Sequence, residues 1–243
     1  MSIWGKMAGA ATGFALGGPI GALLGAVAGH FGVDRQLTHD EADGSPENQI
    51  AFTVGVIALG AKMAKADGVV TPDEIAAFKE VFRVPQGEMH NVARIFNLAK
   101  QDVAGYEAYA AQLAHLFRDN RELLEDVLEG LFHIAAADGV LHPKEDEYLQ
   151  EVAERFGFSA AEFRSIRARF VPRDRSDPFK VLGVPHDASL EVIKARYRKL
   201  IQENHPDKAI ARGMPTEFIK IATDKVAAIN AAHEQILKER GTK

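Results

Sequence analysis

The 243-residue sequence predicts an all-α protein. Apolar residues recur at helical spacing through the middle and the C-terminal third of the chain, and no segment shows the alternation of a half-buried strand. The first 33 residues differ from the rest because they are rich in glycine and almost free of charge. We therefore expect an N-terminal apolar helix, a central helical bundle and a C-terminal helical hairpin.

The distribution of charge supports this division into three units. Residues 1–33 carry a single charged side chain, whereas residues 34–176 carry 16 basic and 25 acidic side chains and residues 177–243 carry 12 basic and 9 acidic ones. The chain has no cysteine, which excludes disulfides, thiolate metal sites and cysteine nucleophiles. We expect these boundaries: an anchor at 1–33, a polar linker at 34–48, a bundle at 49–170, a second linker at 171–176 and a hairpin at 177–243.

The N-terminal run is long enough to cross a membrane. No charged residue occurs from Met7 to Phe31, and this span as a helix would measure about 37 Å, against a hydrocarbon core of roughly 30 Å. Trp4 lies just outside the run, where an indole favours the membrane interface. We therefore predict a transmembrane helix. A cleaved secretion signal and a soluble glycine-rich arm are the two alternatives.

Glycine occupies every fourth position of this run. A period of four drifts by about 40° per step around an α-helix, so the glycines form a slanting row. Rows of small residues at this spacing let two membrane helices approach closely. We expect the anchor to form a homodimer through this row, which comprises Gly9, Gly13, Gly17, Gly21, Gly25 and Gly29.

The middle unit contains an internal repeat of an acidic turn. The sequence AKADGVVTPDE begins at Ala64, and AAADGVLHPKE begins at Ala135. In both copies the glycine is placed to end a helix in the left-handed conformation, and the proline is placed to begin the next helix. In the second copy His142 is a weak N-cap, with Glu145 in position to complete a capping box. The repeat therefore predicts tight helix-helix turns.

A divalent cation is the alternative interpretation of these turns. Their candidate ligands are four carboxylates, Asp67, Glu74, Asp138 and Glu145. An EF-hand would need further oxygen ligands at alternate positions, and these loops lack them. The layout resembles the TerB-like helical domain of tellurite resistance, whose paired helices carry such acidic turns. We expect no required cofactor.

The sequence offers no catalytic residues. Its nine histidines are scattered and form neither an HExxH motif nor another recognised ligand spacing. It has no phosphate-binding glycine loop after a strand and no nucleophile elbow. We therefore expect a protein that is not itself an enzyme.

The C-terminal unit has clear helix boundaries. Asp177 and Pro178 mark a helix start, Gly183 ends a short apolar turn, and Ser189 is an N-cap for a second helix. That helix carries an apolar set, Val192, Ile193, Tyr197, Leu200 and Ile201, and a cationic set, Lys194, Arg196, Arg198 and Lys199. The sequence HPDK follows it, and a long third helix is expected from about Glu217.

Four segments of this unit resemble the J domain, namely DPFKVLGV, IKARYRKL, HPDK and INAAHEQI. The resemblance implies that the unit stimulates the ATPase of a DnaK-type chaperone. It assigns partner contacts to His205, Pro206 and Asp207, and to the four cations of the second helix. His233 departs from the pattern, because many J domains have tyrosine there. The unit is only mildly basic and lacks a nucleic-acid motif, so we expect no nucleic-acid partner.

The order of the three units is similar to that of the DjlA-type membrane-anchored, DnaJ-like co-chaperones. This resemblance implies a single-pass protein of the bacterial inner membrane. Its TerB-like and J-like units would lie in the cytoplasm, because a DnaK-type partner needs ATP. A second hypothesis is a TerB-type sensor of divalent metal or envelope stress whose J domain is vestigial.

Overall fold

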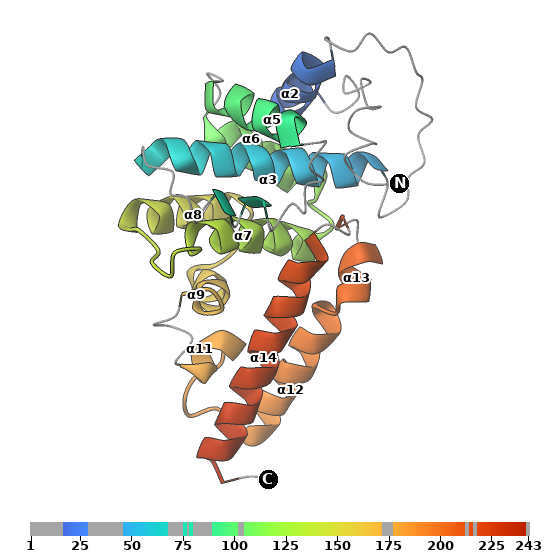
Figure 1. Cartoon of the computed structure of the whole chain (residues 1–243). Helices are drawn as coiled ribbons and strands as arrows, with labels where there is room; N and C mark the ends of the chain where they lie inside the picture. Colours follow the sequence, from blue (N-terminus) through green and yellow to red (C-terminus); the bar gives the residue numbers. More distant parts are fainter. Residues whose placement is uncertain are drawn as a thin grey trace.

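The structure is a computed structural model that describes residues 17–28, 46–67, 75–76, 78–79, 89–101, 105–171, 177–211, 214–215 and 218–241. Every regular element in these ranges is helical, which confirms the all-α prediction for them. In Figure 1, α3 lies between α5 and α6 on one side and α7 and α8 on the other, and α12 and α14 form a hairpin that projects from this bundle. The main helices are α2 (Gly18–Ala28), α3 (Pro46–Asp67), α5 (Met89–Gln101), α6 (Tyr106–Leu116), α7 (Arg121–Ala135), α8 (Pro143–Arg155), α9 (Ala160–Ala168), α11 (Pro178–Leu182), α12 (Leu190–Glu203), α13 (Pro206–Ala211) and α14 (Ile219–Glu239).

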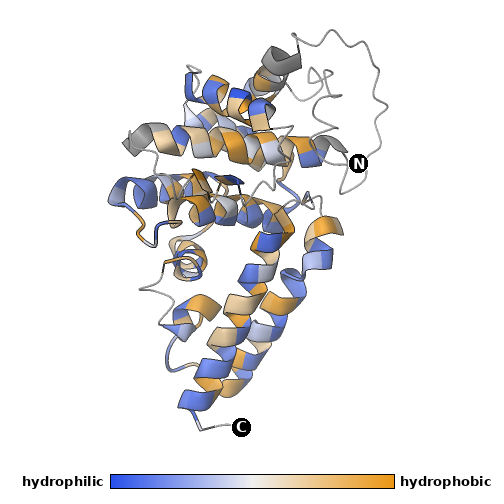
Figure 2. Ribbon diagram, in the orientation of Figure 1, coloured by the Kyte–Doolittle hydropathy of each residue, from blue (hydrophilic) through white to orange (hydrophobic). Residues whose placement is uncertain are grey.

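Helix α3 is the centre of the bundle. Every residue from Ile50 to Ala64 is buried, as expected for a helix that is apolar on all sides and surrounded by other helices. Figure 2 shows the contrast between this mostly apolar middle and the alternating polar and apolar residues of α12 and α14. The helix begins at Pro46, inside the stretch expected to be a polar linker.

The second acidic turn confirms the left-handed glycine and the helix start at proline, but Gly139 does not itself end α7, whose C-cap is Ala136. Helix α7 ends at Ala135, Gly139 has a left-handed φ of 85°, and Pro143 begins α8. The backbone N–H of His142 donates a hydrogen bond of 3.1 Å to the Glu145 carboxylate. This bond satisfies a donor that the start of the helix would otherwise leave without a partner. The first acidic turn, residues 68–74, lies outside the described residues.

The predicted helix boundaries of the hairpin are also confirmed. The Asp177 carboxylate accepts from the backbone N–H of Phe179 at 3.1 Å, and the Ser189 hydroxyl accepts from that of Val192 at 3.3 Å. Gly183 ends α11 with φ of 67°, a conformation that glycine adopts without strain. The third helix begins at Ile219, two residues after the expected start.

The hairpin shares its apolar core with the bundle. One cluster combines the bundle core with five residues of the C-terminal unit, namely Ala209, Met214, Phe218, Ile221 and Ala222. A second, smaller cluster lies between α11, α12 and α14, and it includes Ala168 from α9. The Phe218 ring packs edge-on against the Phe52 ring of α3, with 4.9 Å between their centroids. The two units are therefore packed into one body.

The N-terminal membrane helix is not confirmed. Helix α2 has 11 residues, buries Ile20 and Leu23, and packs on α5 and α6. Gln112 of α6 accepts a hydrogen bond from the backbone N–H of Ile20 and donates one to the carbonyl of Gly17. None of the helices in the described ranges is both long enough and apolar enough to span a bilayer. Three of the predicted dimer glycines, Gly9, Gly13 and Gly29, lie outside the described residues, whereas Gly17, Gly21 and Gly25 lie at or within α2.

Candidate functional site

The His-Pro-Asp sequence lies where α12 ends and α13 begins. His205 stands between the two helices, and Pro206 and Asp207 lie in the first turn of α13. We call residues 205–207 the His-Pro-Asp loop. The side chains of His205 and Asp207 are 55% and 88% exposed. The backbone N–H of Asp207 donates to His205 Nδ1 at 3.2 Å, and this ring nitrogen lies 3.7 Å from the Asp207 carboxylate. Pro206 fixes one backbone dihedral between them and begins α13. The loop thus presents an imidazole and a carboxylate, held close together, to solvent.

Both sides of this loop are fixed by hydrogen bonds. Before it, the buried Asn204 side chain donates to the carbonyl of Leu200 at 2.8 Å. After it, the carbonyl of His205 accepts from the backbone N–H groups of Lys208 and Ala209 at 2.9 and 3.1 Å. Ala209 is buried, and its carbonyl accepts from the backbone N–H of Met214. The exposed side chains therefore stand on an ordered backbone.

The four predicted cations of α12 lie on two edges of the helix and have different neighbours. Lys194 and Arg198 lie one turn apart, and Arg198 Nε donates to the carbonyl of Lys194 at 3.2 Å. Arg196 and Lys199 lie toward the other edge, because successive helical residues are turned by about 100°. Arg196 Nε donates to the carbonyl of Leu182 at 3.1 Å, which ties α12 to α11. Lys194 and Arg198 are thus the pair turned away from the bundle.

Arg196 and Lys199 border a crevice of about 130 Å³ between the hairpin and the bundle. Three bundle carboxylates, Glu122, Glu125 and Glu162, line the same crevice. Arg121 and Arg169 of the bundle and Glu203 of α12 also line it, so charges of both signs lie on both sides of the junction. Arg196 and Lys199 therefore lie at the packing interface between the hairpin and the bundle.

His233, which departs from the J-domain pattern, packs inside the hairpin. Its ring stacks on Tyr197, with 3.9 Å between centroids and 7° between planes. The Tyr197 hydroxyl donates to the Asn230 side chain at 3.0 Å. Burial, and to a smaller extent Lys194, lower the pKa of His233. The neutral ring is therefore favoured at neutral pH.

Two of the four carboxylates that were candidate metal ligands accept hydrogen bonds from the backbone of the turn. The Asp138 carboxylate accepts from the backbone N–H of Val140 at 2.8 Å, and the buried Glu145 carboxylate accepts from that of His142. Asp67 is the last residue of α3, and Glu74 lies outside the described residues. Among the residues that the structure describes, there is no group of three or more side chains suited to hold a metal ion.

A buried charge cluster at the junction of the two units was not anticipated from the sequence. Lys225 Nζ of α14 lies 3.1 Å from Glu125, 3.0 Å from Glu129 and 3.6 Å from Asp126, all carboxylates of α7. Arg169 Nη1 lies 2.7 Å from Glu125 and 2.6 Å from Glu129. The Lys225 side chain has no solvent exposure. Five charged side chains thus meet where α14 crosses α7.

The electrostatics of the cluster follow from its excess of one acid. Burial raises the pKa of Glu129 to about 7, against the opposing effect of the two cations. For Glu125 the two cations outweigh burial and hold its pKa well below the usual range. The carboxylates likewise outweigh burial at Lys225 and Arg169 and raise the pKa of each. Both cations therefore stay charged, and Glu129 is the member that exchanges a proton near neutral pH.

A sequence signal for this cluster does exist. Lys225 lies four residues after Ile221 and four before Ile229, so it occupies a core position of the apolar pattern of α14. A lysine at a core position is rarely buried without a paired charge. The acidic residues of α7 interrupt an apolar run in a similar way. The sequence thus marks both halves of the cluster, although it does not show that they meet.

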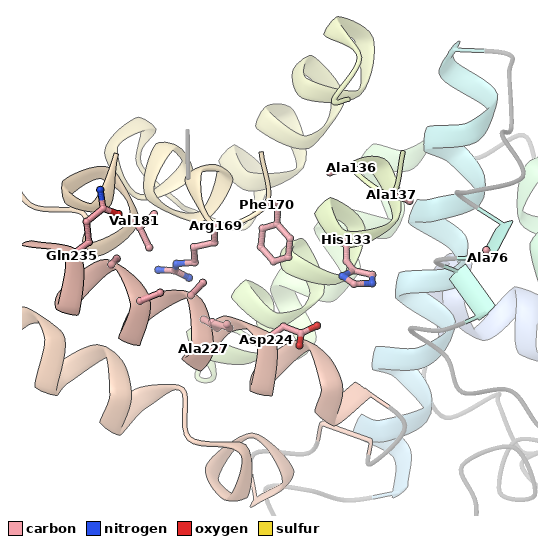
Figure 3. Close-up of a pocket in the computed structure, with 14 residues that line it drawn as sticks. Ala76, His133, Ala136, Ala137, Arg169, Phe170, Val181, Asp224, Ala227 and Gln235 are labelled. Atoms are coloured by element: carbon pink, nitrogen blue, oxygen red, sulfur yellow. The ribbon is translucent and has the colours of Figure 1, made fainter. Parts of the chain in front are cut away.

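A cleft of about 710 Å³ opens beside the cluster. Figure 3 shows His133, Arg169 and Phe170 on the bundle side, and Asp224, Ala227 and Gln235 on α14. Most of the α14 wall consists of alanine, so the cleft exists because small side chains line the helix there. The cleft thus lies between α14 and the bundle.

The geometry and the family models define the class of protein. A helical hairpin that presents an exposed His-Pro-Asp loop is the arrangement of a J domain, and residues 177–241 match the DnaJ domain model. Residues 53–168 match the model described as tellurite resistance protein TerB. Residues 1–43 match the model described as the co-chaperone DjlA transmembrane domain. The chain is therefore a J-domain protein with a TerB-like bundle.

Comparison with curated proteins identifies the family. The chain is 32% identical to a co-chaperone protein DjlA of Photobacterium profundum, over 99% of this chain and 100% of that protein. It is also 32% identical to the co-chaperone protein DjlA of Coxiella burnetii, over 97% of both chains, and 28% identical to that of Escherichia coli O157:H7, over 100% of both. The chain belongs to the DjlA family of co-chaperones. No solved structure matches it.

Proposed function

We propose that this protein stimulates the ATPase of a DnaK-type chaperone through its exposed loop, and that it recruits this chaperone to the inner membrane. The observation that carries the proposal is the exposure of His205 and Asp207 at the end of a cationic helix. The match of this region to the DnaJ domain and the family membership support the same assignment. The protein itself catalyses no reaction in this proposal.

The cations of α12 and the residues of the His-Pro-Asp loop have different roles in binding the chaperone. Lys194 and Arg198 are exposed on the edge turned away from the bundle, where they attract an acidic partner surface and accelerate its approach. His205 and Asp207 then contact the chaperone as a donor and acceptor pair on an ordered loop. Arg196 and Lys199 contribute at the edge nearer to the bundle. Charge attraction sets the encounter, and the loop makes the specific contact.

The test is an ATPase assay with the full-length protein in detergent. We expect the wild type to increase hydrolysis by the DnaK-type chaperone, and we expect His205→Gln to abolish the increase. Gln keeps a polar side chain but removes the imidazole, and the exposed position makes the change harmless to folding. His186→Gln, at another exposed histidine of the same unit, is the matched control. Equal stimulation by the wild type and His205→Gln would refute the proposal.

The membrane part of the proposal rests on residues 1–43, which match the DjlA transmembrane domain. We propose that this segment crosses the inner membrane once and that the bundle and the J domain lie in the cytoplasm. The glycine row then joins two copies of the protein. Gly21→Leu should weaken self-association in a membrane reporter assay and leave insertion unchanged, because leucine keeps the segment apolar. Gly21→Ala keeps a small residue and serves as the control. Unchanged self-association of Gly21→Leu would exclude the dimer.

A further inference from the structure

The residues that follow the His-Pro-Asp loop are anchored in the core of the bundle. Ala209 comes two residues after Asp207, and it belongs with Met214 and Phe218 to the same apolar cluster as α3 and α7. All three are almost completely buried. Phe218 makes the direct ring contact with Phe52 of α3. The bundle therefore supports the loop from behind.

The buried charge cluster fastens the next part of α14. Lys225 lies two turns after Phe218 and is enclosed by the three carboxylates of α7. Between these two contacts, Ile221 lies against Gly130, where an added methyl group would be 3.5 Å from Ile221 Cδ1. The first two turns of α14 are thus held by an aromatic contact, a close helix approach and an ion cluster.

The contacts with the bundle leave the partner surface open. His205 and Asp207 remain exposed while Ala209 and Phe218 are buried. The pair Lys194 and Arg198 is exposed as well. A chaperone can therefore meet this surface without first separating the hairpin from the bundle.

We propose that the TerB-like bundle positions the His-Pro-Asp loop for the chaperone, and that Lys225 is the positioning residue that keeps α14 in place. This inference rests on the proposed function, and it adds a residue that does not touch the partner. A loop that is already ordered loses less conformational entropy on binding than a free loop does. We call the ion pairs between Lys225 and the carboxylates of α7 the clamp. Loss of the clamp should weaken chaperone binding but leave the maximal stimulation of the ATPase intact, since His205 and Asp207 are still present.

The decisive variant is Lys225→Met in the full-length protein. Methionine matches the length of the lysine stem but removes the charge, so the carboxylates of α7 lose one of their two cations. Lys220→Met, five residues earlier on the same helix, is the control, because Lys220 is more exposed and pairs with Asp224 within α14. We expect the amides of 207–211 to exchange hydrogen about tenfold faster in Lys225→Met and to be unchanged in Lys220→Met.

An ATPase titration distinguishes positioning from a purely structural role, because it measures the half-maximal chaperone concentration and the maximal stimulation separately. We expect the chaperone concentration for half-maximal stimulation to rise about tenfold in Lys225→Met, with the maximum retained. Faster exchange with an unchanged titration would overturn the positioning role, and unchanged exchange would overturn the clamp. An inactive wild type would instead refute the proposed function, while the exchange comparison still tests the clamp.

A double variant keeps the test valid if Lys225→Met folds poorly. Combining Lys225→Met with Glu125→Gln removes one charge of each sign, so the cluster keeps its balance. We expect the double variant to regain slow exchange at 207–211 and to reach half-maximal stimulation at a chaperone concentration near that of the wild type. A double variant that is as defective as the single one would contradict the charge-based clamp.

Discussion

The two halves of α14 belong to different cores. The first half, with Ile221 and Lys225, packs against the bundle, whereas the second half, with Ile229 and Ile236, packs against α11 and α12. The first half lies close to the His-Pro-Asp loop, and the second lies toward the C-terminus. One helix thus links the stability of the His-Pro-Asp loop to that of the bundle. At its loop end, the J domain is packed on the bundle and does not stand as an independent module.

The largest expected effect comes from Phe218→Ala compared with Ile236→Ala. Phe218→Ala should reduce the free energy of unfolding by about 3–5 kcal/mol, because it hollows the core that both units share. Ile236→Ala should cost about 2–4 kcal/mol and loosen only the hairpin. Hydrogen exchange distinguishes the two cases, since only Phe218→Ala should speed exchange in α7. If both variants left α7 protected, the two cores would be independent.

A medium change in the free energy of unfolding is expected with pH, because Glu129 lies in the ion cluster between α7 and α14. Its pKa rises from 4.5 to about 7 in the folded protein, so its stabilising contribution is complete below pH 4.5 and is lost as pH rises through 7. The full change is on the order of 3 kcal/mol. The lowered pKa of Glu125 acts in the opposite sense, but only below about pH 4.5, outside this window.

Urea titrations followed by helical circular dichroism would measure this dependence. The free energy of unfolding should fall between pH 5 and pH 8 in the wild type. Glu129→Gln, which imitates the protonated acid, should flatten the slope, so the difference between the two proteins isolates the contribution of Glu129. Identical slopes would show that the cluster does not exchange a proton in this window.

The smallest effect is expected at Gly130, where α14 approaches α7. A methyl group there would lie at 3.5 and 3.6 Å from Ile221 Cδ1 and Val56 Cγ1, which are ordinary contact distances. Gly130→Ala should therefore raise the free energy of unfolding by up to about 1 kcal/mol through helix propensity. Gly130→Leu should instead cost about 1–3 kcal/mol by overpacking. A thermal melt of each variant checks the sign, and destabilisation by alanine would mean that α14 lies closer than the structure shows.

The sequence predicted local features well, because local chemistry determines them. The caps at Asp177 and Ser189 and the turn at Gly139 follow from one residue and its neighbours. The position of the His-Pro-Asp sequence after a cationic helix also requires only local information. The same reasoning explains why Glu145 was correctly interpreted as part of a helix start.

The packing of the hairpin on the bundle could not be predicted in this way. Lys225 and Glu129 are 96 residues apart in the chain, and each alone suggests only a charged residue in an apolar pattern. The four cations of α12 are visible in the sequence, but the crevice that Arg196 and Lys199 border is completed by residues of α7 and α9. Contacts of this kind depend on how helices cross, which one sequence does not encode locally.

The most direct test of the account is native-state hydrogen exchange of the wild type across α14 and α7. We predict that the amides of the first half of α14, near Ile221 and Lys225, open with the same free energy as the core amides of α7, because they share one cooperative core. The second half of α14 should open at lower free energy. If the whole of α14 opened together while α7 stayed protected, the hairpin would be an independent module, and the central claim would be wrong.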